Sequence, residues 1–73
     1  MIEEYINKFV VITFRNRGAD LRTIAYVVEV KDGFVKLEAP AQKNQYLVSL
    51  SAIIEVAELP ESQVRPEYRR DTK

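Results

Sequence analysis

Apolar and polar residues alternate along most of the first 59 positions, and the period of the alternation changes once. The opening segment, 2–9, has Ile2, Tyr5 or Ile6, and Phe9 at helical spacing, with acidic residues in its first turn. It predicts a short N-terminal helix laid over one end of the domain, with a frayed extension of the first strand as the alternative. From position 9 onward the period is two, which is typical of β-strands.

Five segments have the alternation and the β-branched and aromatic composition of strands. The predicted strands are 9–15, 21–31, 34–39, 46–50 and 53–59. Turn residues at 16–20, Asp32-Gly33 and a polar loop at 40–45 separate the first four. The second strand is about twice the usual length. A strand this long must curl in a small domain, and we expect the bend at Ala25 because of its small side chain.

Pro60 ends the last strand, and mostly polar residues follow it. We therefore expect one mainly β domain over 1–59, made of a short N-terminal helix and a five-stranded, strongly bent antiparallel barrel, followed by a polar C-terminal tail over 60–73. Two interpretations of the tail stay open. It is a disordered solubilising segment, or it makes a basic and aromatic contact through Arg65, Arg69, Arg70 and Tyr68.

The short chain limits how stable a single copy can be. A domain of 73 residues buries only about 60% of the surface that its unfolded chain exposes. Disulfides, a structural metal or oligomerisation usually compensate, and the chain has no Cys and no His. The last two strands are apolar on both faces and call for a partner. We expect a homo-oligomer whose subunit interface contains Leu47, Ser49, Leu50, Ile53, Ile54 and Val56.

The missing Cys and His also exclude most enzyme chemistry. Thiol nucleophiles, Ser-His relays, imidazole acid–base catalysis and Cys/His zinc sites all need these residues. The remaining carboxylates occupy ordinary structural positions. Glu3 and Glu4 begin the predicted helix, Glu55 and Glu58 alternate with apolar residues on a strand, and Asp32 lies in a turn. We expect no enzyme activity, no metal and no cofactor.

Eleven basic and eleven acidic residues give a formal net charge of zero. Nucleic-acid binding must therefore come from a local patch rather than from the overall field. No apolar run approaches the ~18 residues of a membrane span, and the N-terminus lacks the pattern of a signal peptide. Together with the missing cysteines, this predicts a cytoplasmic protein with no membrane partner.

The order of the predicted elements, the Asp-containing hairpin and the Ser-Ala-Ile-Ile-Glu-Val sequence at 51–56 resemble the Sm-like family, including its bacterial host-factor branch. The resemblance covers roughly residues 2–59. It implies an Sm-like (SH3-like) barrel in which the fourth strand of one subunit pairs with the fifth strand of the next, giving a ring of about five to seven subunits. It also implies single-stranded RNA as a partner.

Asp32 matches the Asp of the family's first motif, and Phe34 matches its base-stacking position. Lys36 stands where the family has an Asn that reads the base edge. The second motif lies over 48–53, which contains neither the Arg-Gly of archaeal and eukaryotic members nor the Tyr-Lys-His of the bacterial variant. The expected RNA-binding residues are Lys31, Phe34 and Lys36. Stacking plus charge predicts weak sequence preference and a strong salt dependence.

Other interpretations stay open. Phe34 could pack between subunits, with the lysines as solvated charges. The ring could be a protein–protein adaptor or scaffold that has lost RNA binding, as the missing Arg and His suggest. A monomeric SH3-like barrel that binds peptides would need an exposed aromatic groove. The four tyrosines are scattered along the chain, however, and two fall on expected core faces.

Overall fold

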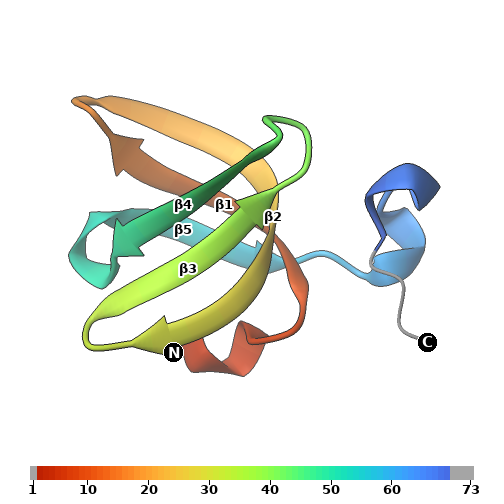
Figure 1. The fold of residues 1–73 in the computed structure, drawn as a ribbon, viewed down its shortest axis with the longest axis horizontal. Coiled ribbons are helices and arrows are strands. Elements are labelled where there is room, and N and C mark those ends of the chain that lie inside the picture. The colour runs from red at the N-terminus through yellow and green to blue at the C-terminus, as the bar shows by residue number, and fades with distance from the viewer. Residues whose placement is uncertain (1, 70–73) are drawn as a thin grey trace.

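The computed structural model describes residues 2–69, which form one five-stranded antiparallel sheet (Figure 1). In chain order the elements are the 3-10 turn η1 (Ile2–Tyr5), the strands β1 (Phe9–Asn16), β2 (Ala19–Lys31), β3 (Phe34–Ala39) and β4 (Asn44–Ser49), the 3-10 turn η2 (Leu50–Ala52), the strand β5 (Ile53–Glu58), and the 3-10 turns η3 (Glu61–Gln63) and η4 (Pro66–Tyr68). The strand order is β4-β3-β2-β1-β5. The prediction of a mainly β domain with five antiparallel strands is confirmed. The sheet is not closed, so β4 and β5 are its two edges.

Two tight hairpin turns set the register of the first three strands. Arg17 and Gly18 join β1 to β2, and Asp32 and Gly33 join β2 to β3, all with positive φ between 54° and 83°. Positive φ at both positions is what a two-residue turn needs to match the twist of its strands. The predicted Asp-Gly turn is confirmed. The longer turn expected over 16–20 is wrong, because the strand pairs continue to the two-residue turn itself.

The sheet bends at β2, which changes its partner halfway along. Residues up to Tyr26 pair with β1, and residues from Tyr26 onward pair with β3. The register with β3 shifts between Val27 and Glu29, so Val28 is the extra residue of a β-bulge. A bulge bends the strand that carries it and increases its twist. The bend was expected at Ala25, which pairs regularly with β1, and the irregularity lies three residues beyond it, at Val28.

The core lies on the inner side of this bend. It contains Ile2 and residues from four strands: Val10, Ile12, Phe14, Ala25, Val27, Val35, Leu37 and Val48. Phe14 on β1 meets Tyr46 on β4 edge to face, with ring centroids 5.4 Å apart. Because β2 and β3 separate these strands in the sheet, the contact shows that the sheet curls around its core.

The N-terminal segment forms one 3-10 turn instead of the longer predicted helix. Ile2 is buried, and Tyr5 and Ile6 pack against the core, so the segment covers the core as expected. Asn7 has a φ of 68°, and its N–H donates to the Val27 carbonyl oxygen at 2.8 Å. This bond directs the chain into β1 before a second helical turn can form. The alternative of an extended strand is also wrong.

The turn between β3 and β4 is shorter than the predicted loop over 40–45. Asn44 and Gln45 already belong to β4, which pairs with β3 from Asn44 onward. Lys43 makes this possible because its φ of 54° reverses the chain in the last position of the turn. At the other end, Leu50 begins η2 and is not part of the strand.

The segment from Pro60 to Arg69 is folded, which differs from the interpretation of a disordered solubilising tail. Val64 is 2% exposed. The Arg69 side chain donates to the Val64 carbonyl oxygen at 2.9 Å and to that of Ser62 at 3.2 Å. Arg70, one of the expected contact residues, lies outside the described residues.

Over the described part of the chain, no helix has the length and apolar composition needed to cross a membrane.

Candidate functional site

The outer face of β2, β3 and β4 presents three cross-strand rows of side chains. Starting from the β2–β3 turn, these rows are Lys31–Phe34–Ser49, Glu29–Lys36–Leu47 and Tyr26–Glu38–Gln45. The intervening residues of β3, Val35, Leu37 and Ala39, are buried, as the alternation predicts. Directly opposed side chains on one face of a sheet lie within contact distance, so each row acts as one group of neighbours.

The structure brings the three expected RNA-binding residues together in the first two rows. Lys31 stands directly opposite Phe34, and Lys36 lies two residues further along β3 on the same face. Phe34 is 43% exposed, so part of its ring is available to a ligand. Both lysines are exposed. An accessible ring flanked by two ammonium groups can stack on a base while neutralising phosphate.

Two acidic residues offset these lysines. Glu29 is the cross-strand neighbour of Lys36, and Asp32 follows Lys31 in the turn. The formal charge of these four residues sums to zero. Because opposite charges attract across a strand pair, Glu29 lowers the positive potential that Lys36 offers to a phosphate.

The two free sheet edges carry exposed aliphatic side chains. Leu47 on β4 is 70% exposed and Ile54 on β5 is 54% exposed. Together with Phe34, they are the exposed large hydrophobic residues of the described chain. Among residues 2–69, no strand pairs with the outer side of β4 or β5. A free edge with exposed apolar side chains is a surface on which another chain can pair.

The other expected interface residues have roles within the protomer. Leu50, Ile53 and Val56 are partly buried and pack against the core. Ser49 is the N-cap of η2, because its Oγ accepts a hydrogen bond from the Ser51 backbone N–H at 3.3 Å. Its Oγ also shares a hydrogen bond with the Ser51 Oγ at 2.9 Å. Leu47 and Ile54 therefore remain the most accessible members of the set.

A second β-bulge explains why Ile54 points away from the core. The register of β5 with β1 shifts between Thr13 and Phe14, and Ile54 is the extra residue. Ile53 and Val56 both pack against the core although they are three residues apart. The bulge thus accounts for the apolar character of both faces of β5, and it gives the edge an exposed side chain.

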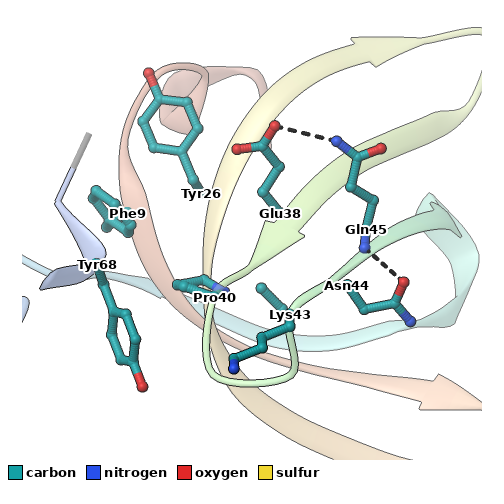
Figure 2. Close-up of a pocket in the computed structure, with 9 residues that line it drawn as sticks. Phe9, Tyr26, Glu38, Pro40, Lys43, Asn44, Gln45 and Tyr68 are labelled. Atoms are coloured by element: carbon teal, nitrogen blue, oxygen red, sulfur yellow. Dashed lines mark hydrogen bonds between the residues drawn. The ribbon is translucent and has the colours of Figure 1, made fainter. Parts of the chain in front are cut away.

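A groove of about 430 Å³ lies at the far end of the same outer face (Figure 2). The third row lies along it, and the other lining residues include Phe9, Pro40 and Tyr68. The sequence does not reveal this groove, because Tyr26 and Tyr68 are far apart in the chain and the polar composition after Pro60 predicts a tail outside the domain. Val64 and Tyr68, an apolar pair four residues apart in a polar segment, were the available signal.

The remaining charged groups are dispersed. Arg22 pairs with Glu55 at 3.5 Å and Lys8 pairs with Glu58 at 3.8 Å, and all four side chains are about half exposed or more. Over the described residues, no group of three or more His, Cys, Asp or Glu side chains could hold a metal ion.

Comparisons of the chain with protein-family models, with curated proteins and with solved structures gave no match.

Proposed function

We propose that this chain is an Sm-like protein that assembles head to tail into a homo-oligomeric ring and binds single-stranded RNA with weak sequence preference. The observation that carries the proposal is the pair of open edges. β4 and β5 lie at opposite ends of the sheet, and each presents an exposed aliphatic residue, Leu47 or Ile54. Pairing of the two edges between copies buries both residues and gives the free backbone groups partners.

The chain geometry favours a ring over a simple dimer. β4 and β5 are different surfaces, so a contact between β4 of one copy and β5 of another is heterologous, and every added copy offers the same free edge. Only η2 separates the two strands in the chain, which limits their relative movement. The added burial also compensates for the small core of a 73-residue domain.

The proposed protomer fold is the strongly bent Sm-like (SH3-like) barrel. Three features of the sheet support it: the strand order β4-β3-β2-β1-β5, the division of β2 between two partners, and the contact of Phe14 with Tyr46 across the core. The last two are features of a sheet that curls on itself, and the strand order places β4 and β5 at its two edges. The edges β4 and β5 then lie at the opening of the curled sheet, where a neighbouring copy can reach them.

RNA lies across the first two rows of the outer face in this proposal. Phe34 stacks on a base, and Lys31 and Lys36 contact phosphates. These rows contain no Asn or Gln side chain that could read a base edge, so sequence preference is weak. The acidic neighbours of the lysines favour the second candidate, a scaffold ring without RNA binding.

Fluorescence anisotropy with labelled oligo-uridine separates the two candidates. The proposal predicts saturable binding that weakens with salt, with a slope of log affinity against log salt near −1.4 for about two phosphate contacts. Phe34→Ala should remove about 1–3 kcal/mol of binding free energy, and Phe34→Tyr, which keeps the ring, should retain most of it. An oligomer that shows no binding would favour the scaffold, and binding that is unchanged in Phe34→Ala would mean that the RNA does not stack on Phe34.

A further inference from the structure

We infer that the groove at the far end of the outer face binds an extended, proline-containing peptide segment of a partner protein. The segment carries a basic residue at the end of the groove formed by Glu38 and an acidic residue at the end formed by Lys43. This inference uses residues outside the proposed RNA site and does not depend on ring assembly. It also revises the expectation that the tyrosines are too scattered to form an aromatic groove.

The aromatic side of the groove is rigid. Phe9 is 5% exposed and meets Tyr26 edge to face, with ring centroids 5.1 Å apart. The Tyr26 hydroxyl donates to the Asn7 Oδ1 at 3.3 Å, which fixes the orientation of the ring. A surface held in place before binding loses little conformational entropy when a ligand arrives, which favours binding.

Tyr68, on the same side of the groove, is presented by a folded segment. Its backbone N–H donates to the Arg65 carbonyl oxygen at 2.8 Å and closes η4. The segment is held by buried Val64 and by the Arg69 side chain, which donates to two carbonyl oxygens of the same segment. Figure 2 shows Tyr68 beside Phe9, with Pro40 between Tyr68 and the sheet. Aromatic and proline rings therefore border the groove from four separate parts of the chain.

The position of the groove on a sheet face decides the backbone conformation of the ligand. The third row, Tyr26–Glu38–Gln45, crosses three paired strands, and β3 has ladder partners on both sides. A ligand on this face meets side chains rather than free ladder groups. A polyproline II segment has no internal hydrogen bonds, keeps its backbone solvated and docks on aromatic-lined grooves. This conformation suits the face better than an added β-strand does.

The charges of the groove favour a peptide over a nucleic acid. Figure 2 shows the Glu38 carboxylate and the Lys43 ammonium group at opposite ends. Glu38 Oε2 accepts a hydrogen bond from Gln45 Nε2 at 3.2 Å, which positions the carboxylate. The two charges sum to zero, whereas nucleic-acid binding depends on a positive surface. A peptide with one residue of each sign complements both ends.

The remaining polar group can bind the ligand backbone. The Asn44 Oδ1 accepts a hydrogen bond from the Gln45 backbone N–H at 2.9 Å, which orients the side-chain amide. The N–H groups of that amide are suitable donors for the carbonyl oxygens of a polyproline II segment. The groove thus combines ring contacts, a donor and two opposite charges.

The test uses the full chain and a fluorescein-labelled oligoproline peptide with one arginine and one glutamate at opposite ends. Anisotropy should show saturable binding that weakens about tenfold in Tyr68→Ala and changes less than about threefold in Tyr68→Phe. Glu38→Gln should weaken binding of this peptide and leave unchanged a peptide with alanine in place of arginine. Glu67→Gln makes the same charge change at an exposed position of η4 outside the groove, and it should affect neither peptide.

Three results would overturn the inference. The first is no saturable binding of the peptide. The second is binding that is unchanged in both Tyr68→Ala and Glu38→Gln, because a peptide in the groove would contact both of these side chains. The third is binding of oligo-uridine that is lost in Tyr68→Ala while the peptide does not bind, which would assign the groove to nucleic acid. The first two results do not bear on Phe34 or on the strand edges, whereas the third would also move the RNA site away from Phe34.

Discussion

The rings of Phe14 and Tyr46 meet edge to face although β2 and β3 separate their strands in the sheet. Aromatic pairs of this kind contribute about 0.5–1.5 kcal/mol beyond the burial of their surface. We expect Tyr46→Leu to lower the free energy of unfolding by about 1–2 kcal/mol, measured by urea denaturation followed by circular dichroism. Tyr46→Phe keeps the ring and should stay within about 0.5 kcal/mol of the wild type. Equal losses in the two variants would contradict the contact.

The β1–β2 turn places a side chain in an unfavourable backbone conformation. Arg17 has a φ of 54°, which Asn adopts at lower cost than Arg. Arg17→Asn should therefore raise the free energy of unfolding by about 0.5–1 kcal/mol. The same change at Arg22, inside β2, serves as the control and should lower it, because Asn is disfavoured in strands and the ion pair with Glu55 is lost. A neutral or destabilising Arg17→Asn would mean that the turn has another geometry.

The proposed RNA site should bind more tightly once its acidic neighbour is neutralised. Glu29→Gln removes the negative charge opposite Lys36, and we expect oligo-uridine affinity to rise about two- to fivefold at low salt. The gain should shrink as salt increases, because added ions screen the charge. Glu61→Gln, the same charge change in η3, is the control. If both variants bind like the wild type, the RNA does not contact Lys36.

The regular strands could be predicted from the sequence, and the bulged strands could not. β3 alternates without interruption, so its boundaries and its buried face followed from the period of two, and β1 was predicted to within one residue, because it ends at Asn16. In β2 and β5 an inserted residue, Val28 or Ile54, changes which side chains face the core. Neither residue type signals a bulge, because Val and Ile are ordinary strand residues. The bulges depend on pairing between strands, which composition does not reveal.

The same distinction explains which parts of the candidate sites were found. The Asp32-Gly33 turn fixes the register of β2 and β3, so the opposition of Lys31 and Phe34 follows from local sequence. The groove depends on tertiary contacts instead. Tyr68 reaches it only because the C-terminal segment folds around buried Val64. A polar segment after the last strand gave too weak a pattern to predict that.

Head-to-tail pairing of β4 with β5 is the central claim, and native mass spectrometry of two edge variants tests it directly. Leu47→Lys damages only the β4 edge, and Ile54→Lys damages only the β5 edge. Both positions are exposed, so each variant should fold. A lysine on a free edge opposes pairing. Leu47→Lys keeps an intact β5 edge and Ile54→Lys keeps an intact β4 edge. In an equal mixture these two edges can pair, and the two edges that remain free both carry a lysine, so no further copy can add.

We predict one closed oligomer for the wild type, monomers for each variant alone, and heterodimers but no larger species for the mixture. Glu61→Lys, a new lysine away from both edges, should assemble like the wild type. A monomeric wild type would contradict the account. So would full assembly of either variant alone, because that result would mean that copies pair through like edges or through another surface.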